Sequence, residues 1–304
     1  MNIVLTGSIG RIGKPLTQHL VDRGHSVTVI SSTADRQPEI EALGATAAIG
    51  ALEDPYFLTT LFTGADIVYL MEPPFNFFDP TRTVEEAWLE VAESYLQAVR
   101  QSGVRNIVHL SSIGGHTDAG IGFLKTHHIV ENRLKSLPEE VVIKTMRPVG
   151  FYYNMFAFIP AIQHTGAIVQ NYGGDQKEPW VSPLDIAAVI VEEMETPFNG
   201  RTVRYIASDV FSPNEAAAAL GAAIGQPDLR WKVIPDDQFR SNLLQVGFTP
   251  QAADGTVEMN QSRLRHLYDD YHQNPPALGT VKLAHFAHNF AVAYHHAAQP
   301  SHSH

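Results

Sequence analysis

The stretch that decides the fold is Met1-Asn2-Ile3-Val4-Leu5-Thr6-Gly7-Ser8-Ile9-Gly10-Arg11-Ile12-Gly13. An apolar strand pattern runs into three glycines spaced G-x-x-G-x-x-G, and a helical pattern and a second strand pattern follow. Gly7 allows a sharp turn off the strand, Gly10 lets the backbone approach a diphosphate, and Gly13 lets the helix pack closely. An ordinary strand–turn–helix is the alternative. The context favours a dinucleotide-binding loop formed by Gly7, Ser8, Ile9, Gly10, Arg11, Ile12 and Gly13.

The composition is that of an ordinary globular protein: 304 residues, 44% hydrophobic and 17% charged. A formal net charge of −11 argues against direct binding of nucleic acid, which needs a basic face. The absence of cysteine excludes disulfides, thiolate catalysis and zinc–thiolate sites. No apolar run is long enough to cross a bilayer, and the first strand begins at once. We therefore expect a cytoplasmic protein, monomeric or homodimeric, that acts on a small molecule.

Short apolar strands alternate with amphipathic helices through the first half of the chain. The expected strands are 2–6, 26–30, 46–49, 66–69, 106–110 and 141–145. This alternation predicts an α/β protein with a Rossmann-type doubly wound parallel sheet. After Arg147-Pro148 aromatic residues become dense, and the rest of the chain reads as mostly helical.

The change in character at Pro148 sets the expected domains. We expect a dinucleotide-binding domain at 1–150, to which 182–207 returns. A smaller, mostly helical C-terminal substrate lobe would comprise 151–181 and 208–298, followed by a tail at 299–304. The ligand cleft of such a fold lies at the carboxyl ends of the strands.

Fifteen histidines are many for this length. Several gather near the end, where a frayed or appended histidine-rich tail is favoured over a metal site: His285, His288, His295, His296, His302 and His304. His127, His128 and Glu131 contain a possible ligand pair at helical i, i+4 spacing, but a convincing further ligand is missing. A helix beside an active site explains them better, so no metal is expected.

The end of the second strand indicates the nucleotide. NAD-preferring folds place an acidic residue there to hold the ribose diol, whereas this chain has Ser31-Ser32-Thr33. These hydroxyls suit a 2′-phosphate, and Arg11 and Arg36 would supply positive charge. We expect NADP(H), with NAD(H) as the alternative. A solvated surface role is equally open for Arg36.

Further stretches carry a resemblance to a known family. They are Thr145-Met146-Arg147-Pro148-x-x-Phe151-x-x-Asn154, Gly166–Val169 with the Gly173-Gly174 turn, Trp180–Ala187, Gly247–Pro250 and Leu283–Ala287. With the glycine loop, they resemble the NmrA-like atypical short-chain dehydrogenase/reductases, which include quinone and triphenylmethane-dye reductases. The resemblance implies that Asp54 contacts the adenine edge, although a helix cap before Pro55 is an equal alternative.

The chain departs from short-chain dehydrogenases at one place. The stretch Gly120–His128 contains no tyrosine, so the usual Tyr-x-x-x-Lys pair is absent. The resemblance places Ser112 near the usual catalytic serine and Lys125 near the family's lysine. His127 and His128 are the nearby side chains with a proton available near neutral pH. Electrophilic acceptors need little acid help, so the missing tyrosine does not exclude catalysis.

Other residues are expected near the cofactor or acceptor because they follow the ends of strands. Met71, Ser111 and Pro148 would lie beside the cofactor. The clusters that contain Phe75 and Phe151-Tyr152 would form flat walls around a planar acceptor, although core packing explains them equally well.

Two hypotheses of function follow. The first is an NADP(H)-dependent oxidoreductase that transfers hydride to a small planar acceptor such as a quinone or aromatic compound. The alternative is a redox-sensing regulator that binds NADP(H) without turnover. An epimerase or carbonyl reductase is disfavoured by the absent tyrosine.

Overall fold

The structure, a computed structural model, describes residues 1–297. Seven parallel strands form its central sheet in the order β10-β6-β5-β4-β1-β2-β3. Their bounds are β1 (Asn2–Leu5), β2 (Ser26–Ser31), β3 (Thr46–Ile49), β4 (Ile67–Leu70), β5 (Asn106–Leu110), β6 (Val142–Pro148) and β10 (Arg201–Ile206). Strand order reverses between β1 and β4, which makes this the topological switch point of a Rossmann-type sheet.

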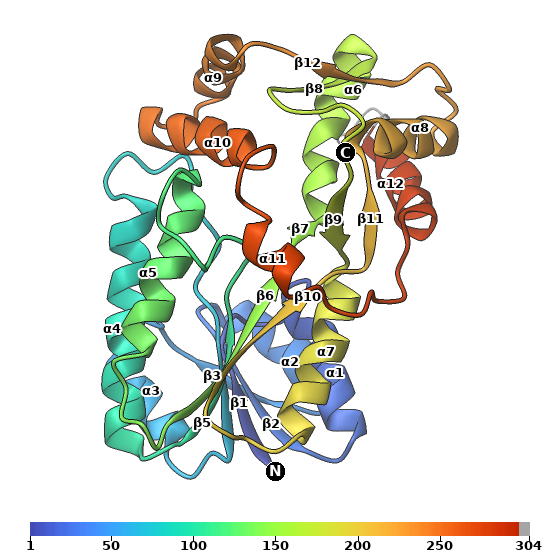
Figure 1. The fold of residues 1–304 in the computed structure, drawn as a ribbon. Helices are drawn as coiled ribbons and strands as arrows, with labels where there is room; N and C mark the ends of the chain where they lie inside the picture. Colours follow the sequence, from blue (N-terminus) through green and yellow to red (C-terminus); the bar gives the residue numbers. More distant parts are fainter. Residues whose placement is uncertain (298–304) are drawn as a thin grey trace.

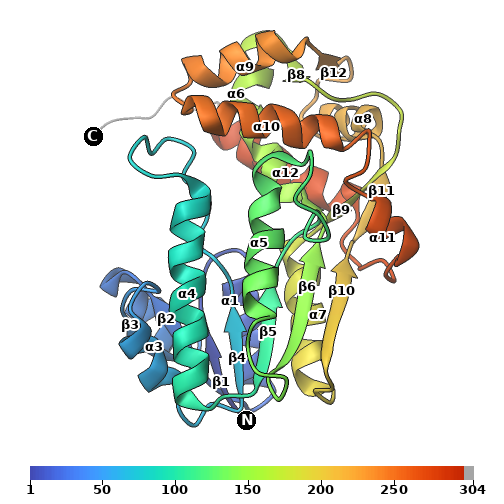
Figure 2. The same ribbon diagram turned by 60° about the vertical axis from the view of Figure 1, so that its left-hand side comes forward.

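Helices cover both faces of this sheet (Figures 1 and 2). One face carries α1 (Gly13–Asp22), α2 (Gln37–Ala42) and α7 (Pro183–Glu195). The other carries α3 (Pro55–Phe62), α4 (Val84–Ser102) and α5 (Lys125–Leu134). Parallel strands buried on both faces read as continuous apolar runs, and β4 is buried at all four of its positions.

The second part of the molecule lies over the carboxyl ends of the sheet (Figure 1). Its helices are α6 (Ile159–Thr165), α8 (Pro213–Ala223), α9 (Asp236–Gln245), α10 (Pro250–Ser262), α11 (Asp269–Gln273) and α12 (Leu283–Ala297). It also contains two small sheets that the sequence patterns did not reveal, β11-β9-β7 and β12-β8. These strands are β7 (Gly150–Phe151), β8 (Ala167–Gln170), β9 (Glu178–Val181), β11 (Asp209–Phe211) and β12 (Arg230–Val233).

The connections matter because they bring the two parts together. Three short 3₁₀ segments, η1 (Ala34–Arg36), η2 (Gly122–Leu124) and η3 (Tyr152–Phe158), lead into helices. The chain leaves the sheet after β6, returns through α7 and β10, and leaves again.

Within residues 1–297, none of the helices combines the length and the apolar character that crossing a bilayer requires.

Candidate dinucleotide and active site

The glycine loop joins β1 to α1 at the switch point of the sheet. Gly7 has a φ of +84°, and a side chain there would overlap Met71. A Cβ at Gly13 would overlap the carbonyl oxygen of Ser8. Gly10 is different, because the nearest atom to its Cβ would be the Gly7 carbonyl oxygen at 3.9 Å. The conformation of the loop therefore requires glycine at positions 7 and 13. At position 10 the space beside the backbone is open.

The helix that follows this loop begins without a side-chain cap. Ile12 is the N-cap residue of α1 and offers no hydrogen-bond acceptor. Thr83 caps α4 and Ser182 caps α7, whereas α5 and α9, like α1, have no side-chain cap. Uncapped N–H groups at the positive end of a helix favour an anionic ligand. Together with the open space at Gly10, these donors make the loop a fitting cradle for a diphosphate.

The end of β2 lies against this cradle. The Ser8 hydroxyl donates to the buried Ser31 hydroxyl at 3.1 Å, which ties the loop to the strand. Ser32 is exposed. Beyond it, Arg36 and Lys14 both pair with Glu39, at 3.2 Å and 2.9 Å respectively. The sequence reasoning missed Lys14 and Glu39, because α1 and α2 meet only in the folded chain.

Arg11 requires a correction. We expected it to join Arg36 at the end of β2. Instead its guanidinium lies over the ring of Tyr153 in η3 and lines a cavity of about 750 Å³ between η3, α7 and α12. Arg36 and Lys14, which both pair with Glu39, are the cations found beyond the end of β2.

The chain after β4 runs beside the glycine loop. The Met71 N–H donates to the Thr6 hydroxyl at 2.9 Å, and Tyr95 donates to the Met71 carbonyl at 2.6 Å. The Met71 side chain lies against Gly7. These contacts place Met71 against the glycine loop, and its expected contact with a bound cofactor stays a prediction.

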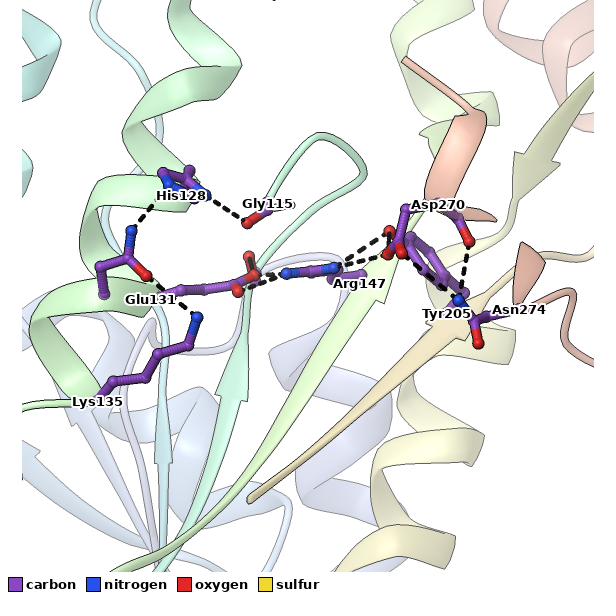
Figure 3. Close-up of polar contacts among 10 residues, drawn as sticks. Gly115, His128, Glu131, Lys135, Arg147, Tyr205, Asp270 and Asn274 are labelled. Carbon is purple, nitrogen blue, oxygen red and sulfur yellow. Dashed lines mark hydrogen bonds and ion pairs between the residues drawn. The ribbon is translucent and has the colours of Figure 1, made fainter. Parts of the chain in front are cut away.

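Glu131 of α5 and Arg147 of β6 form a buried ion pair (Figure 3). Arg147 donates from Nε and Nη2 to the two oxygens of Glu131, at 2.9 Å and 2.6 Å. Ser111 donates its hydroxyl to the same carboxylate at 2.6 Å. Ser111 is therefore fully engaged and buried. It holds Glu131, and no free hydroxyl is left to polarise a substrate.

Arg147 also ties the second part of the molecule to the sheet. Its Nη1 donates to Asp270 of α11 at 3.0 Å and to the Tyr205 hydroxyl at 3.2 Å. Tyr205 donates to the same Asp270 oxygen at 2.6 Å. Burial lowers the pKa of Arg147, but the bonded Glu131 and Tyr205 raise it further, so the net pKa is raised. The guanidinium stays charged.

A second buried pair lies nearby. His109 Nε2 contacts Glu72 at 3.2 Å, and both side chains are almost fully buried. Burial lowers the pKa of His109, but the Glu72 carboxylate outweighs it, so the pKa is raised. The sequence reasoning missed Glu72, His109 and Arg147 as site residues. A charged residue inside an apolar strand, as in Asn106–Leu110, was the available signal.

The expected proton donors are differently placed. Lys125 is exposed and pairs with Glu85 at 3.2 Å. Burial, with help from the nearby charges of His109 and Arg147, lowers the pKa of His127 to about 3. His127 is therefore neutral near pH 7, which corrects its expected role as an acid.

His128 is also engaged on both ring nitrogens. Its Nδ1 lies 3.0 Å from the Gly115 carbonyl and its Nε2 lies 2.8 Å from the amide nitrogen of Asn132 (Figure 3). A carbonyl can only accept, so Nδ1 carries the proton and Nε2 accepts from Asn132. Lys135 fixes that amide by donating to its oxygen at 3.1 Å. Ser112 is half-buried, and its hydroxyl makes no hydrogen bond within residues 1–297. It remains available to a substrate.

The aromatic residues separate into two groups. Phe75 is half-buried and stacks on Trp88 with ring centroids 4.5 Å apart, close to Phe123. Tyr152 is only 1% exposed, with its ring beside Phe211 and Phe286. Tyr152 thus belongs to the core of the second part, which corrects its expected role as a substrate wall. Phe151 is half-buried and directly follows Gly150, so it remains a candidate.

The structure also shows where Pro148 and Asp54 lie. Pro148 ends β6 and is buried, and its carbonyl accepts from Ile113 at 2.8 Å. Asp54 caps α3 by accepting from Tyr56 and Phe57, as the cap reading predicted. Within residues 1–297, no group of three or more acidic or histidine side chains is placed to hold a metal. His302 and His304 lie outside the described residues.

The comparisons with known proteins agree with this geometry. The NmrA-like family matches residues 1–272, and the chain belongs to that family. An NAD(P)H azoreductase of Xenophilus azovorans is 24% identical over 258 residues, 84% of this chain and 85% of the relative.

Solved structures share the fold. An NADPH-dependent quinone oxidoreductase from Escherichia coli, solved with NADPH, has a TM-score of 0.78 at 19% identity over 94% of this chain and 99% of that chain. A triphenylmethane reductase from Citrobacter, complexed with NADP(H), has a TM-score of 0.74 at 16% identity over 96% of this chain and 100% of that chain. These likenesses confirm the Rossmann-type fold that the sequence predicted.

Proposed function

We propose that the chain is an NADP(H)-dependent reductase that transfers hydride to a small planar acceptor such as a quinone, an azo compound or a cationic dye. The observation that carries the proposal is the glycine loop at the switch point, where Gly10 leaves open space beside an uncapped helix. The family membership and the reductases among its relatives support the same reading.

Each part of the nucleotide would have its own residues. The loop N–H groups and the start of α1 would bind the diphosphate, and the exposed Ser32 with Lys14 and Arg36 would receive a 2′-phosphate. Met71 would cover the loop from the other side. When bound, the reduced nicotinamide supplies hydride, so the protein has only to align the acceptor and exclude water.

The proposed acceptors are those that need little acid catalysis. The expected proton donors are already engaged within the protein. Lys125 forms an ion pair with Glu85, and Ser111 donates to Glu131. His128 is hydrogen-bonded to Gly115 and Asn132. His127 is neutral, with its pKa near 3. A ketone would need a positioned acid, whereas a quinone or cationic dye is already electrophilic. Ser112 is the polar side chain left to orient the acceptor.

The test is consumption of NADPH against a panel of quinones, azo compounds, triphenylmethane dyes and ketones, followed by stopped-flow absorbance at enzyme-level concentrations. We expect turnover with the electrophilic acceptors and little with the ketones. In the variants His127→Ala, His128→Ala and Lys125→Ala, turnover should fall by less than the roughly 10²–10⁴-fold that a positioned acid contributes.

Two outcomes would contradict the proposal. A thousandfold loss in one of these variants, with nucleotide affinity unchanged, would identify an essential proton donor and favour a carbonyl substrate. Tight NADPH binding with no oxidation by any acceptor would favour a sensor that binds the nucleotide without turnover.

A further inference from the structure

The proposed function leaves a large cavity beside the glycine loop without a role. It has a volume of about 750 Å³ and lies between η3, the start of α7 and α12, and we call it the α12 cavity. Sites for small molecules usually have volumes of about 300–1,000 Å³. Its rim is open to solvent, because Leu184 of α7 and Val292 of α12 are 49% and 62% exposed. A ligand can therefore reach the α12 cavity from solvent.

The walls of the α12 cavity are mostly apolar, and several of them are aromatic rings. Tyr153 and Phe156 of η3 have ring centroids 4.6 Å apart with their planes inclined at 58°. Phe286 of α12 lies 5.2 Å from Phe156 with an inclination of 67°. Rings inclined in this way offer both faces and edges, which are the contacts that a further aromatic ring prefers. The walls therefore fit a ligand with an aromatic body.

The α12 cavity differs in charge from the chain as a whole. The formal net charge of the chain is −11, yet none of the described residues that line this cavity is acidic. Its lining includes the cation Arg11 and the polar side chains of His285 and Asn289. These three side chains make no hydrogen bond or ion pair with other side chains in residues 1–297. The cavity is therefore complementary to a ligand that carries a negative charge.

Arg11 indicates which negatively charged group fits. Its guanidinium lies over the ring of Tyr153, and this contact depends on charge rather than on a hydrogen bond. The N–H donors of Arg11 have no acceptor within the part of the chain that the structure describes. Two parallel N–H donors of a guanidinium match the two oxygens of a carboxylate. A carboxylate on an aromatic body therefore fits both the charge and the walls.

We propose that the α12 cavity binds an aromatic monocarboxylate, whose rings lie among the side chains of η3 and α12 and whose carboxylate is bound by Arg11. Binding of this ligand does not depend on the proposed reductase function. Arg11 directly follows Gly10, so the carboxylate would lie beside the loop that the proposed function gives to the diphosphate. Repulsion between the two anions should make each weaken the binding of the other by the same factor.

The experiment is calorimetry of the nucleotide-free protein with 2-naphthoate and with 2-naphthamide, a neutral compound of similar shape. We expect 2-naphthoate to bind at least about tenfold more tightly, because guanidinium–carboxylate hydrogen bonds are charge-assisted. Arg11→Gln should remove most of this difference. The matched control is Arg105→Gln, which removes the same charge from an exposed arginine just before β5 and should leave the difference unchanged. Decanoate, an aliphatic carboxylate, should bind more weakly than 2-naphthoate because it has no ring to stack.

A second variant tests the α12 cavity without changing the glycine loop. Val292→Glu places a carboxylate at the exposed rim, so the affinity for 2-naphthoate should fall by at least about tenfold through repulsion between like charges. Val246→Glu is its matched control, because Val246 is 67% exposed at the end of α9 and lies outside the lining of the cavity. It should bind 2-naphthoate as the wild type does.

Several results would overturn this inference. They are no binding of 2-naphthoate at millimolar concentration, equal binding of 2-naphthamide, or an unchanged difference in Arg11→Gln. Tighter binding of decanoate would overturn the assignment to an aromatic ligand. As NADP⁺ is added, the apparent affinity for 2-naphthoate should fall and then level off, since the two sites are separate. A fall without limit would place 2-naphthoate in the nucleotide site, which refutes the inference and leaves the proposed function intact.

Discussion

At the scale of single residues, the three loop glycines have separable roles. Gly10→Asp adds a carboxylate where the diphosphate would lie, and its Cβ meets nothing closer than 3.9 Å. We expect NADPH affinity to fall by at least about 100-fold, or about 2.7 kcal/mol, with the fold intact. Gly13→Ala would overlap the Ser8 carbonyl oxygen and should destabilise even the nucleotide-free protein by about 1–3 kcal/mol. Calorimetry and urea unfolding distinguish these effects, and unchanged affinity in Gly10→Asp would rule out the loop as the binding site.

Glu39 tests the choice of nucleotide, because it holds both cations near the end of β2. We expect the wild type to bind NADPH at least about tenfold more tightly than NADH, a difference of roughly 1.4 kcal/mol. Glu39→Gln would release Lys14 and Arg36, so NADPH should bind more tightly and NADH about as before. The gain should shrink at high salt, since these groups are exposed. Glu41→Gln is the matched control, and an equal gain for NADH would refute the assignment.

The lowered pKa of His127 predicts that the stability of the protein depends on pH. Its folded pKa of about 3 lies below the ordinary value of 6.5, so the unfolded chain binds more protons between these values. Stability should therefore fall as pH drops from 6.5 towards 3. Between pH 7 and pH 5 this one residue should account for about 2 kcal/mol. Urea unfolding at pH 7 and pH 5 gives the loss of unfolding free energy on acidification. That loss should be smaller by this amount in His127→Leu than in the wild type. In the exposed control His164→Leu it should equal that of the wild type.

At the scale of elements, the Glu131–Arg147 pair joins α5 to β6, and Asp270 extends the link to α11 (Figure 3). Removing one partner leaves the other charged and buried, which typically costs about 3–5 kcal/mol. We expect Arg147→Met to lower the free energy of unfolding by that amount. The double variant Arg147→Met with Glu131→Leu should lose much less than the two single losses combined. Additive losses in urea unfolding would show that the two side chains act independently.

At the scale of the whole molecule, nucleotide binding should be visible as stability. A ligand that binds only the folded state adds about 2.7 kcal/mol at 100 times its dissociation constant. We expect NADP⁺ at that concentration to raise the free energy of unfolding of the wild type accordingly. The same concentration should leave Gly10→Asp unchanged. A similar rise in both proteins would place the nucleotide elsewhere.

The sequence by itself determined the alternating strands and helices and the glycine loop. Both are local properties: apolar runs set the elements, and the positive φ of Gly7 is a requirement of one residue. The expected preference for NADP(H) also came from the sequence, because the lack of an acidic residue at the end of β2 is a local feature of the chain.

Only the tertiary structure decided which polar side chains meet. Arg147 and Asp270 are 123 residues apart in sequence, and Arg263 and Glu178 are 85 apart. It also turned Lys125 towards Glu85, Arg11 towards Tyr153 and Tyr152 into a core of rings. Spacing along one element fixes the face on which a side chain lies, but its partner is set by how separate elements pack. The fold and the nucleotide loop were therefore predictable, whereas the link from Glu131 through Arg147 to Asp270 became visible only in the folded chain.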